Sequence, residues 1–161
     1  LLRDGRLELG DPVNVCVPTG NFGNILAAYY ARDMGVPIQK LICASNCNDV
    51  LTDFLRTGVY DKNRPFHTTM SPSMDILISS NLERLLYQLS GSDEQVRGYM
   101  NALNTTGRYE VSPELKAKIQ ENFAASRRRC EKAQAEFFPP PLFISIFFTN
   151  THFCKNYGIM V

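Results

Sequence analysis

The chain has 161 residues, of which 44% are hydrophobic, and this is enough to form the core of one domain. Its net charge of +1 gives no indication of a nucleic-acid partner or of attraction to an anionic membrane. Cys43 and Cys47 lack a second pair of ligands at metal-binding spacing, which argues against a zinc site. The odd cysteine count and the lack of a recognisable signal peptide favour reduced thiols in a cytoplasmic protein.

Strand-like and helix-like patterns alternate along the chain. We expect a strand near 13–17, a helix near 23–34, a strand near 38–43, and a helix near 48–56 capped by Asn46 or Asn48. Further helices are expected near 82–89 after Asn81, near 93–104 after Ser92, and from Pro113 to about residue 124. This alternation predicts an α/β fold with a parallel sheet and flanking helices, in which ligands bind at the carboxyl ends of the strands.

The loop at 18–24 reads Pro-Thr-Gly-Asn-Phe-Gly-Asn and joins the first predicted strand to the helix after it. At such a junction several backbone N–H groups point to one spot, and the helix dipole adds partial positive charge. Gly20 and Gly23 let the backbone approach an oxyanion closely, and Asn21 and Asn24 can add side-chain donors on either side of Phe22. The loop is therefore a candidate phosphate site, although glycine and asparagine are also common in ordinary turns.

Four segments, taken in this order, resemble threonine synthases of the bacterial and fungal branch: 18–24, 34–38, 44–58 and 71–84. The resemblance extends over about residues 1–125. It implies part of a tryptophan synthase β-like fold with pyridoxal 5'-phosphate as cofactor. It also implies that the cofactor phosphate is held by Gly20, Asn21, Phe22, Gly23 and Asn24.

The resemblance implies an enzyme that converts O-phosphohomoserine and water to threonine and phosphate. In that family the lysine that forms the Schiff base precedes the phosphate loop in a Phe-Lys-Asp-like context, whereas all six lysines here follow Gly20. The hydroxyl that contacts the pyridine nitrogen belongs to a C-terminal segment without a counterpart here. We therefore expect no catalytic residue in this chain, which is then a fragment that is inactive by itself.

Polar residues after the second predicted strand have two possible roles. Asn46, Asn48 and Asp49 lie at the same sheet edge as the Gly20 loop, so they either face the substrate or cap the following helix. Further along the chain, the polar group Ser71, Ser73 and Asp75 either lies near a phosphate-bearing substrate or forms a Ser-Pro turn. Other side chains are expected to lie in loops or in solvent: His67, Arg56 and Arg84.

The sequence divides into a domain fragment at 1–125 and an atypical tail at 126–161. The tail carries five Lys/Arg and two Asp/Glu, a balance of +3, which leaves −2 for the rest of the chain. Its apolar stretch at 137–148 contains three consecutive prolines, and the family resemblance ends before it. The tail is interpreted as aberrant or disordered, from a frameshift, an altered splice or a misassembled end, with a divergent but genuine C-terminal segment as the alternative.

Two other functions stay open besides threonine synthesis. The parent protein could be a threonine synthase-like phospho-lyase, which removes phosphate without making threonine. The chain could instead be a non-catalytic truncated product. In each enzymatic case the expected partner is a small-molecule substrate, with no nucleic acid and no membrane, and the oligomeric state is left open.

Overall fold

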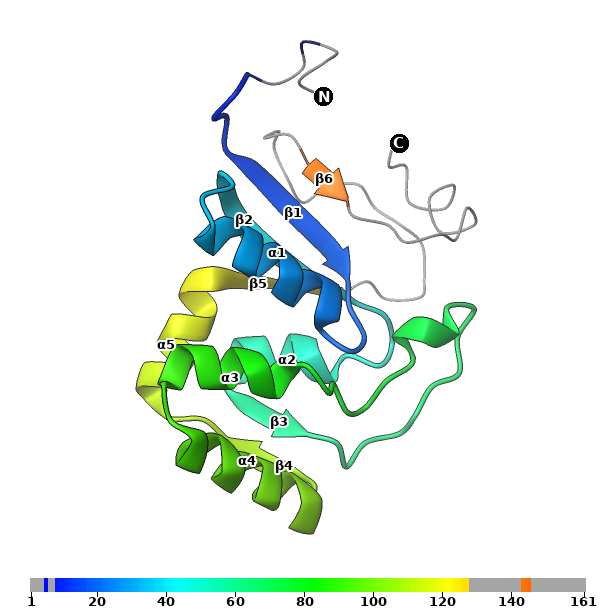
Figure 1. Ribbon diagram of the computed structural model, residues 1–161. Coiled ribbons are helices and arrows are strands. Elements are labelled where there is room, and N and C mark those ends of the chain that lie inside the picture. Colours follow the sequence, from blue (N-terminus) through cyan, green and yellow to red (C-terminus); the bar gives the residue numbers. More distant parts are fainter. Residues whose placement is uncertain (1–4, 6–7, 128–142, 146–161) are drawn as a thin grey trace.

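The computed structural model describes residues 5, 8–127 and 143–145. In chain order its elements are β1 (Val13–Pro18), α1 (Gly23–Asp33), β2 (Ile38–Ser45), α2 (Val50–Thr57), β3 (Val59–Asp61), the 3-10 turn η1 (Pro72–Met74), α3 (Leu82–Ser90), α4 (Asp93–Thr105), β4 (Arg108–Glu110), α5 (Pro113–Asn122), β5 (Phe123–Arg127) and β6 (Phe143–Ser145). Figure 1 shows that α1 lies across the strands, while α3, α4 and α5 gather beside the small β3–β4 pair.

The main sheet has the strand order β5-β2-β1-β6, and each neighbouring pair is parallel. This confirms the predicted α/β fold with a parallel sheet. The register pairs Pro18 at the end of β1 with Ala44 near the end of β2. The loops that follow these two strands therefore leave the sheet at the same edge, as expected for ligand-binding loops in parallel sheets.

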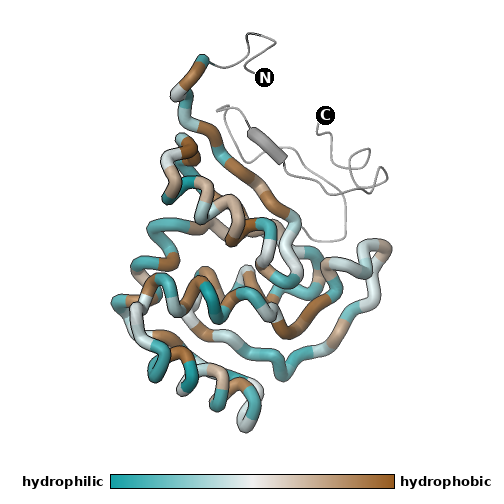
Figure 2. Tube along the Cα trace, viewed as in Figure 1, coloured by the Kyte–Doolittle hydropathy of each residue, from teal (hydrophilic) through white to brown (hydrophobic). Residues whose placement is uncertain are grey.

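One face of the sheet forms the core. Val13, Val15 and Val17 alternate along β1 and are buried against the helices, because successive strand side chains point to opposite faces. Helix α1 contributes Ile25, and α2 contributes Phe54 to the same cluster. In Figure 2, β1 is largely brown, whereas hydrophilic and hydrophobic residues alternate along α4, which leaves one face exposed.

A second, two-stranded antiparallel sheet joins β3 to β4, and the sequence did not predict either strand. Tyr60 and Tyr109 pair directly across it, and their rings stack with centroids 5.3 Å apart at an angle of 3°. Phe54 and Tyr99 make further ring contacts with this pair. Strands of three residues are too short to show a period in the sequence, so the aromatic contacts between distant segments define them.

Helix ends test the capping predictions. The Ser92 hydroxyl accepts from the Gln95 N–H at 3.2 Å, and the Ser112 hydroxyl accepts from the Leu115 N–H at 3.3 Å. For α2 the prediction was wrong, since the N-cap is Asp49 and it makes no side-chain capping bond.

Helix α5 stops two residues before the predicted end, at Asn122. Phe123 is already extended, and β5 pairs with β2 from Phe123 to Arg127. No glycine or proline follows Asn122 to end the helix. The helix ends there because the next residues pair with the free edge of β2.

The tail is described only in part. Strand β5 extends two residues past the proposed boundary at 125, and β6 pairs in parallel with β1 at Asn14, Val15 and Cys16. The other tail residues lie outside the described ranges, so the division at residue 125 stays a prediction. Of the helices described, none is long and apolar enough to cross a membrane.

Candidate functional site

The loop after β1 is anchored to the neighbouring strand. The Thr19 N–H donates to the Ala44 carbonyl oxygen at 2.9 Å, and the Thr19 hydroxyl donates to the Val17 carbonyl oxygen at 2.7 Å. Thr19 is 5% exposed, so these bonds lie inside the protein and hold the start of the loop firmly.

Phe22 gives the loop its shape. Its backbone is left-handed, with φ 65° and ψ 2°, a conformation that residues other than glycine seldom adopt. Its ring is 1% exposed and packs on Phe123 with centroids 5.5 Å apart. Burial of this ring offsets the backbone strain, so packing with β5 fixes the turn that opens α1.

The first turn of α1 has no internal counterion. Phe22 is its N-cap without a side-chain capping bond, and the turn contains no acidic residue. Gly23 and Asn24 are exposed, and no acceptor among the described residues takes a hydrogen bond from their amide groups. These free donors and the positive end of the helix dipole form a local environment that suits an anion.

A segment far away in the sequence packs on the loop. A Cβ atom on Gly20 would lie 2.7 Å from the Ser73 carbonyl oxygen and 2.9 Å from Ile76 Cδ1, so only glycine fits without a shift. The Ser79 hydroxyl donates to the Gly20 carbonyl oxygen at 2.9 Å. The loop is therefore held between β2 and this segment.

Asn81 strengthens the same contact. Its backbone N–H and its side-chain amide both donate to the Asn21 carbonyl oxygen, at 3.2 Å and 2.9 Å. Asn81 is the N-cap residue of α3, as expected, but its side chain makes no capping hydrogen bond, because it already bonds to the loop. The only sequence signal for the contact was a serine followed by an asparagine just before a helix, residue types that are common in turns.

The chain was compared with known proteins, and no family model matches it. It is 50% identical over 127 residues to human threonine synthase-like 1, covering 78% of this chain and 17% of that protein. It is 42% identical over 125 residues to threonine synthase from Saccharomyces cerevisiae, covering 71% of this chain and 24% of that enzyme. The chain therefore spans about a quarter or less of these relatives.

Solved structures agree with the sequence relatives. The PLP-bound threonine synthase from Brucella melitensis matches with a TM-score of 0.71 and 46% identity, over 74% of this chain and 26% of the other. Yeast threonine synthase matches with a TM-score of 0.71 and 40% identity over the same shares. The chain belongs to the threonine synthase family.

In this member of the threonine synthase family, Asp75 organises the second group of polar residues. Its carboxylate accepts hydrogen bonds from the Thr69 N–H and hydroxyl, at 2.7 Å and 2.8 Å, and from the side-chain amides of Asn46 and Asn48, at 2.7 Å and 3.1 Å. Burial, the largest single effect, favours the neutral acid, but these hydrogen bonds outweigh it and lower the pKa of Asp75. The carboxylate therefore ties the loop after β2 to the segment before η1.

The same hydrogen-bond network tests the predicted helix-capping role of the polar residues after β2. Asn48 also donates to the His67 carbonyl oxygen at 2.7 Å and accepts from the His67 N–H at 2.9 Å. His67 is thus held through its backbone, in a loop, as expected. Asp49 pairs with Arg64 at 3.0 Å, and Arg64 also reaches Asp53 at 2.7 Å. Asn46 and Asn48 thus bind a carboxylate and another loop instead of capping α2, and their contact with a substrate stays a prediction.

The cysteines of the described residues lie in different environments. Burial raises the pKa of the Cys43 thiol to about 12, so this thiol is a core side chain and not a nucleophile. Cys43 carries a free thiol. Cys47 is disulfide-bonded, so the expectation of reduced thiols was wrong for this residue. Sequence spacing could not place it, since disulfides depend on the distance between folded segments.

Proposed function

We propose that this chain is the cofactor-phosphate-binding segment of a pyridoxal-phosphate-dependent threonine synthase, with the phosphate held by residues 20–24. The uncapped first turn of α1 carries this proposal, because it offers exposed amides and dipole charge with no acid nearby. Threonine synthase relatives and a PLP-bound neighbour support the identity of the anion.

The residues of the loop fit a phosphate group well. Gly23 and Asn24 supply backbone donors, and the exposed side chains of Asn21 and Asn24 supply amide donors. Phe22 turns the backbone towards the start of α1 and keeps its own ring in the core. Bound pyridoxal phosphate would supply an electron sink for negative charge on substrate carbon atoms.

The loop binds the cofactor phosphate and orients the cofactor, whereas other parts of the enzyme must transfer protons. Residues 19–24 contain no side chain that is a base at neutral pH. Lys40 pairs near the amino end of β1, with Asn14, and its ammonium donates to the Glu121 carbonyl oxygen at 3.4 Å. It therefore lies at the sheet end opposite the loop. We expect the chain alone to bind the phosphate group without converting O-phosphohomoserine.

In the whole protein we propose conversion of O-phosphohomoserine and water to threonine and inorganic phosphate, with a small-molecule substrate as the main partner. A cytoplasmic location is part of the same proposal and rests on the sequence alone.

The charge at the start of α1 gives a direct test of the phosphate site. Asn24→Asp changes an amide to a carboxylate of nearly equal size, which should weaken binding of pyridoxal phosphate and of inorganic phosphate by at least about tenfold. The same charge favours the helix dipole, so the thermal midpoint should not fall. Asn101→Asp on the exposed face of α4 is the matched control. Calorimetric titration measures both, and equal affinity in wild type and Asn24→Asp would exclude the loop as the phosphate site.

A second candidate function is a threonine synthase-like phospho-lyase. The 50% identity to human threonine synthase-like 1, a protein named as like threonine synthase, keeps this second candidate beside the first. The two candidates share the phosphate loop and differ in product. Incubation of the longer protein with O-phosphohomoserine should yield phosphate with threonine in the first case and phosphate without threonine in the second.

A further inference from the structure

The peptide group between Asn21 and Phe22 is bonded at its carbonyl end and open at its N–H end. The carbonyl oxygen accepts two hydrogen bonds from Asn81, from the backbone N–H at 3.2 Å and from the side-chain amide at 2.9 Å. The N–H belongs to Phe22, which is 1% exposed, and no described residue accepts a hydrogen bond from it. Because a buried N–H without an acceptor is rare in proteins, this amide is placed for an acceptor that the described residues do not supply.

The preceding peptide group of the loop has the same arrangement. The Gly20 carbonyl oxygen accepts from the Ser79 hydroxyl at 2.9 Å, while the Asn21 N–H has no acceptor among the described residues. In a planar trans peptide the C=O and N–H bonds point in opposite directions. The two carbonyl oxygens therefore face the segment 79–81, and the two N–H groups face away from it.

The backbone of the next two residues adds further donors to this group. Phe22 is left-handed, with φ 65° and ψ 2°, and Gly23 is the first residue of the right-handed helix α1. A left-handed residue next to a right-handed one brings successive N–H groups around one concave spot that suits an anion. The buried Phe22 amide therefore joins the amides of Gly23 and Asn24, which also have no acceptor among the described residues.

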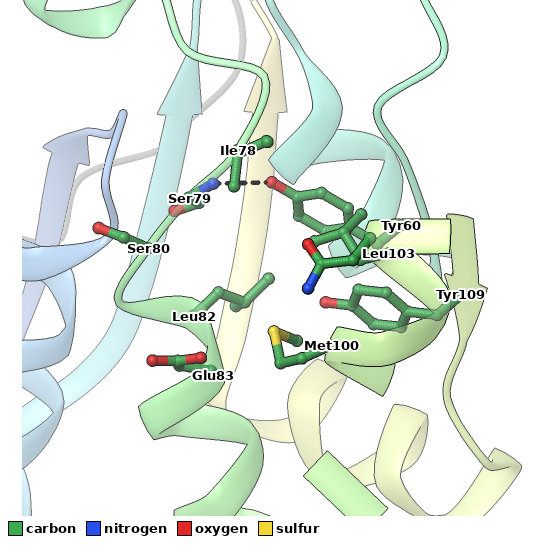
Figure 3. A pocket seen from close by; sticks show the side chains of 10 residues that line it. Tyr60, Ile78, Ser79, Ser80, Leu82, Glu83, Met100, Leu103 and Tyr109 are labelled. Carbon is green, nitrogen blue, oxygen red and sulfur yellow. Dashed lines mark hydrogen bonds between the residues drawn. The ribbon is translucent and has the colours of Figure 1, made fainter. Parts of the chain in front are cut away.

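The segment that holds these carbonyl oxygens is itself fixed from the other side. The Ser79 N–H donates to the Tyr60 hydroxyl at 2.9 Å, as Figure 3 shows, and this hydroxyl donates to the Leu77 carbonyl oxygen at 3.0 Å. A cavity of about 250 Å³ lies on this side, and its lining includes Tyr60, Ser79 and Tyr109. The Tyr60 ring is buried and stacks on Tyr109, so Ser79 and Asn81 reach the loop from a rigid support.

We propose that Asn81 is a positioning residue of the phosphate site, where it directs the buried Phe22 N–H at the phosphate group. Its two donors on the Asn21 carbonyl oxygen fix the plane of this peptide group and polarise it, which strengthens the N–H as a donor. The Asn81 side chain can take this role because it makes no capping bond to α3. Ser79 holds the preceding peptide group in the same way. This inference rests on the proposed function, because Asn81 acts on the same phosphate site through the backbone of the loop.

Inorganic phosphate is the probe, titrated into the 161-residue chain and followed by calorimetry and by NMR of the backbone amides. We expect the amide protons of Phe22, Gly23 and Asn24 to move downfield together as the site saturates. Asn81→Ala should weaken phosphate binding about threefold to tenfold, and it should reduce the shift at Phe22 more than the shifts at the other two residues. Asn101→Ala, on the exposed face of α4, is the matched control and should bind phosphate as wild type.

Selective loss of the Phe22 shift distinguishes positioning from general support of the fold. Asn81→Leu keeps the bulk of the side chain without its donor, so this variant decides the test if Asn81→Ala does not fold. A uniform loss of all three shifts with a lower thermal midpoint would show a purely structural role and overturn the proposal. If phosphate shifts the wild-type amides and the folded variant keeps both its affinity and its Phe22 shift, the phosphate site stands and the role of Asn81 is refuted. If the wild-type chain shows no shift at residues 20–24, the phosphate site itself fails and the role of Asn81 fails with it.

Discussion

The two glycines of the phosphate loop respond in opposite ways to the same substitution. Neither has a positive φ, so alanine fits the backbone at both positions. At Gly20 the new Cβ would lie 2.7 Å from the Ser73 carbonyl oxygen, and this backbone atom must move. At Gly23 the nearest atom, Asn81 Nδ2, is 3.4 Å away, which is ordinary contact. The structure therefore predicts strain at the first position and none at the second.

The magnitudes follow from these distances. Overpacking lowers the free energy of unfolding by about 1–3 kcal/mol. Replacing glycine by alanine also restricts the unfolded chain, which raises the free energy of unfolding by about 0.4–1 kcal/mol. Gly20→Ala should lower the free energy of unfolding by about 1–2 kcal/mol, while Gly23→Ala should raise it by up to about 1 kcal/mol. The difference of about 1–3 kcal/mol between the two variants is measurable by urea denaturation followed by circular dichroism without phosphate. Equal stabilities of the two variants, or a more stable Gly20→Ala, would refute the packing of 73–76 on the loop.

Two other predictions concern hydrogen bonds that reach the same segment. Tyr60→Phe removes a buried hydroxyl that bonds to Leu77 and Ser79, so it should cost about 2–4 kcal/mol in the unfolding free energy, whereas Tyr109→Phe should stay within about 1 kcal/mol. A similar loss in both tyrosine variants would contradict the assigned bonds. The lowered pKa of Asp75 means that its carboxylate stabilises the fold above the ordinary pKa of about 3.9, and that this contribution is lost as the pH falls below it. Asp75→Asn should therefore be about 1–3 kcal/mol less stable than wild type at pH 7, with the gap shrinking towards pH 3, and a gap independent of pH would count against the network.

Local patterns in the sequence were sufficient for the part of the fold that carries the loop. An apolar run, two glycines and a small-residue helix predicted β1, the loop and α1, and the structure has these elements at Val13–Pro18 and Gly23–Asp33. Ser92 and Pro113 predicted two helix starts correctly, because a capping hydroxyl and a first-turn proline both act within their own turn. Strand patterns, turns and helix caps depend on interactions between residues that are close in sequence, so they can be predicted from the sequence alone.

Features that join distant segments could not be found in this way. Phe22 adopts a left-handed backbone because Phe123, about a hundred residues later, buries its ring. Asn46 and Asn48 were predicted as caps from their place before α2, yet Asp75 binds both. The β3–β4 pair exists because Tyr60 and Tyr109 stack across it.

The sequence by itself determined the parallel α/β order, the candidate phosphate loop and the resemblance to threonine synthases. Only the tertiary structure decided how that loop is held: Gly20 against Ser73, Asn21 by Asn81, and Phe22 by Phe123. The physical reason is that glycine and asparagine within a turn determine which backbone conformations it can adopt. Its rigidity, in contrast, comes from burial and from hydrogen bonds to residues that are distant in sequence and close in the folded chain. The cavity beside Tyr60 and Tyr109 has the same origin, since its lining comes from four separate stretches of the chain that meet only after folding.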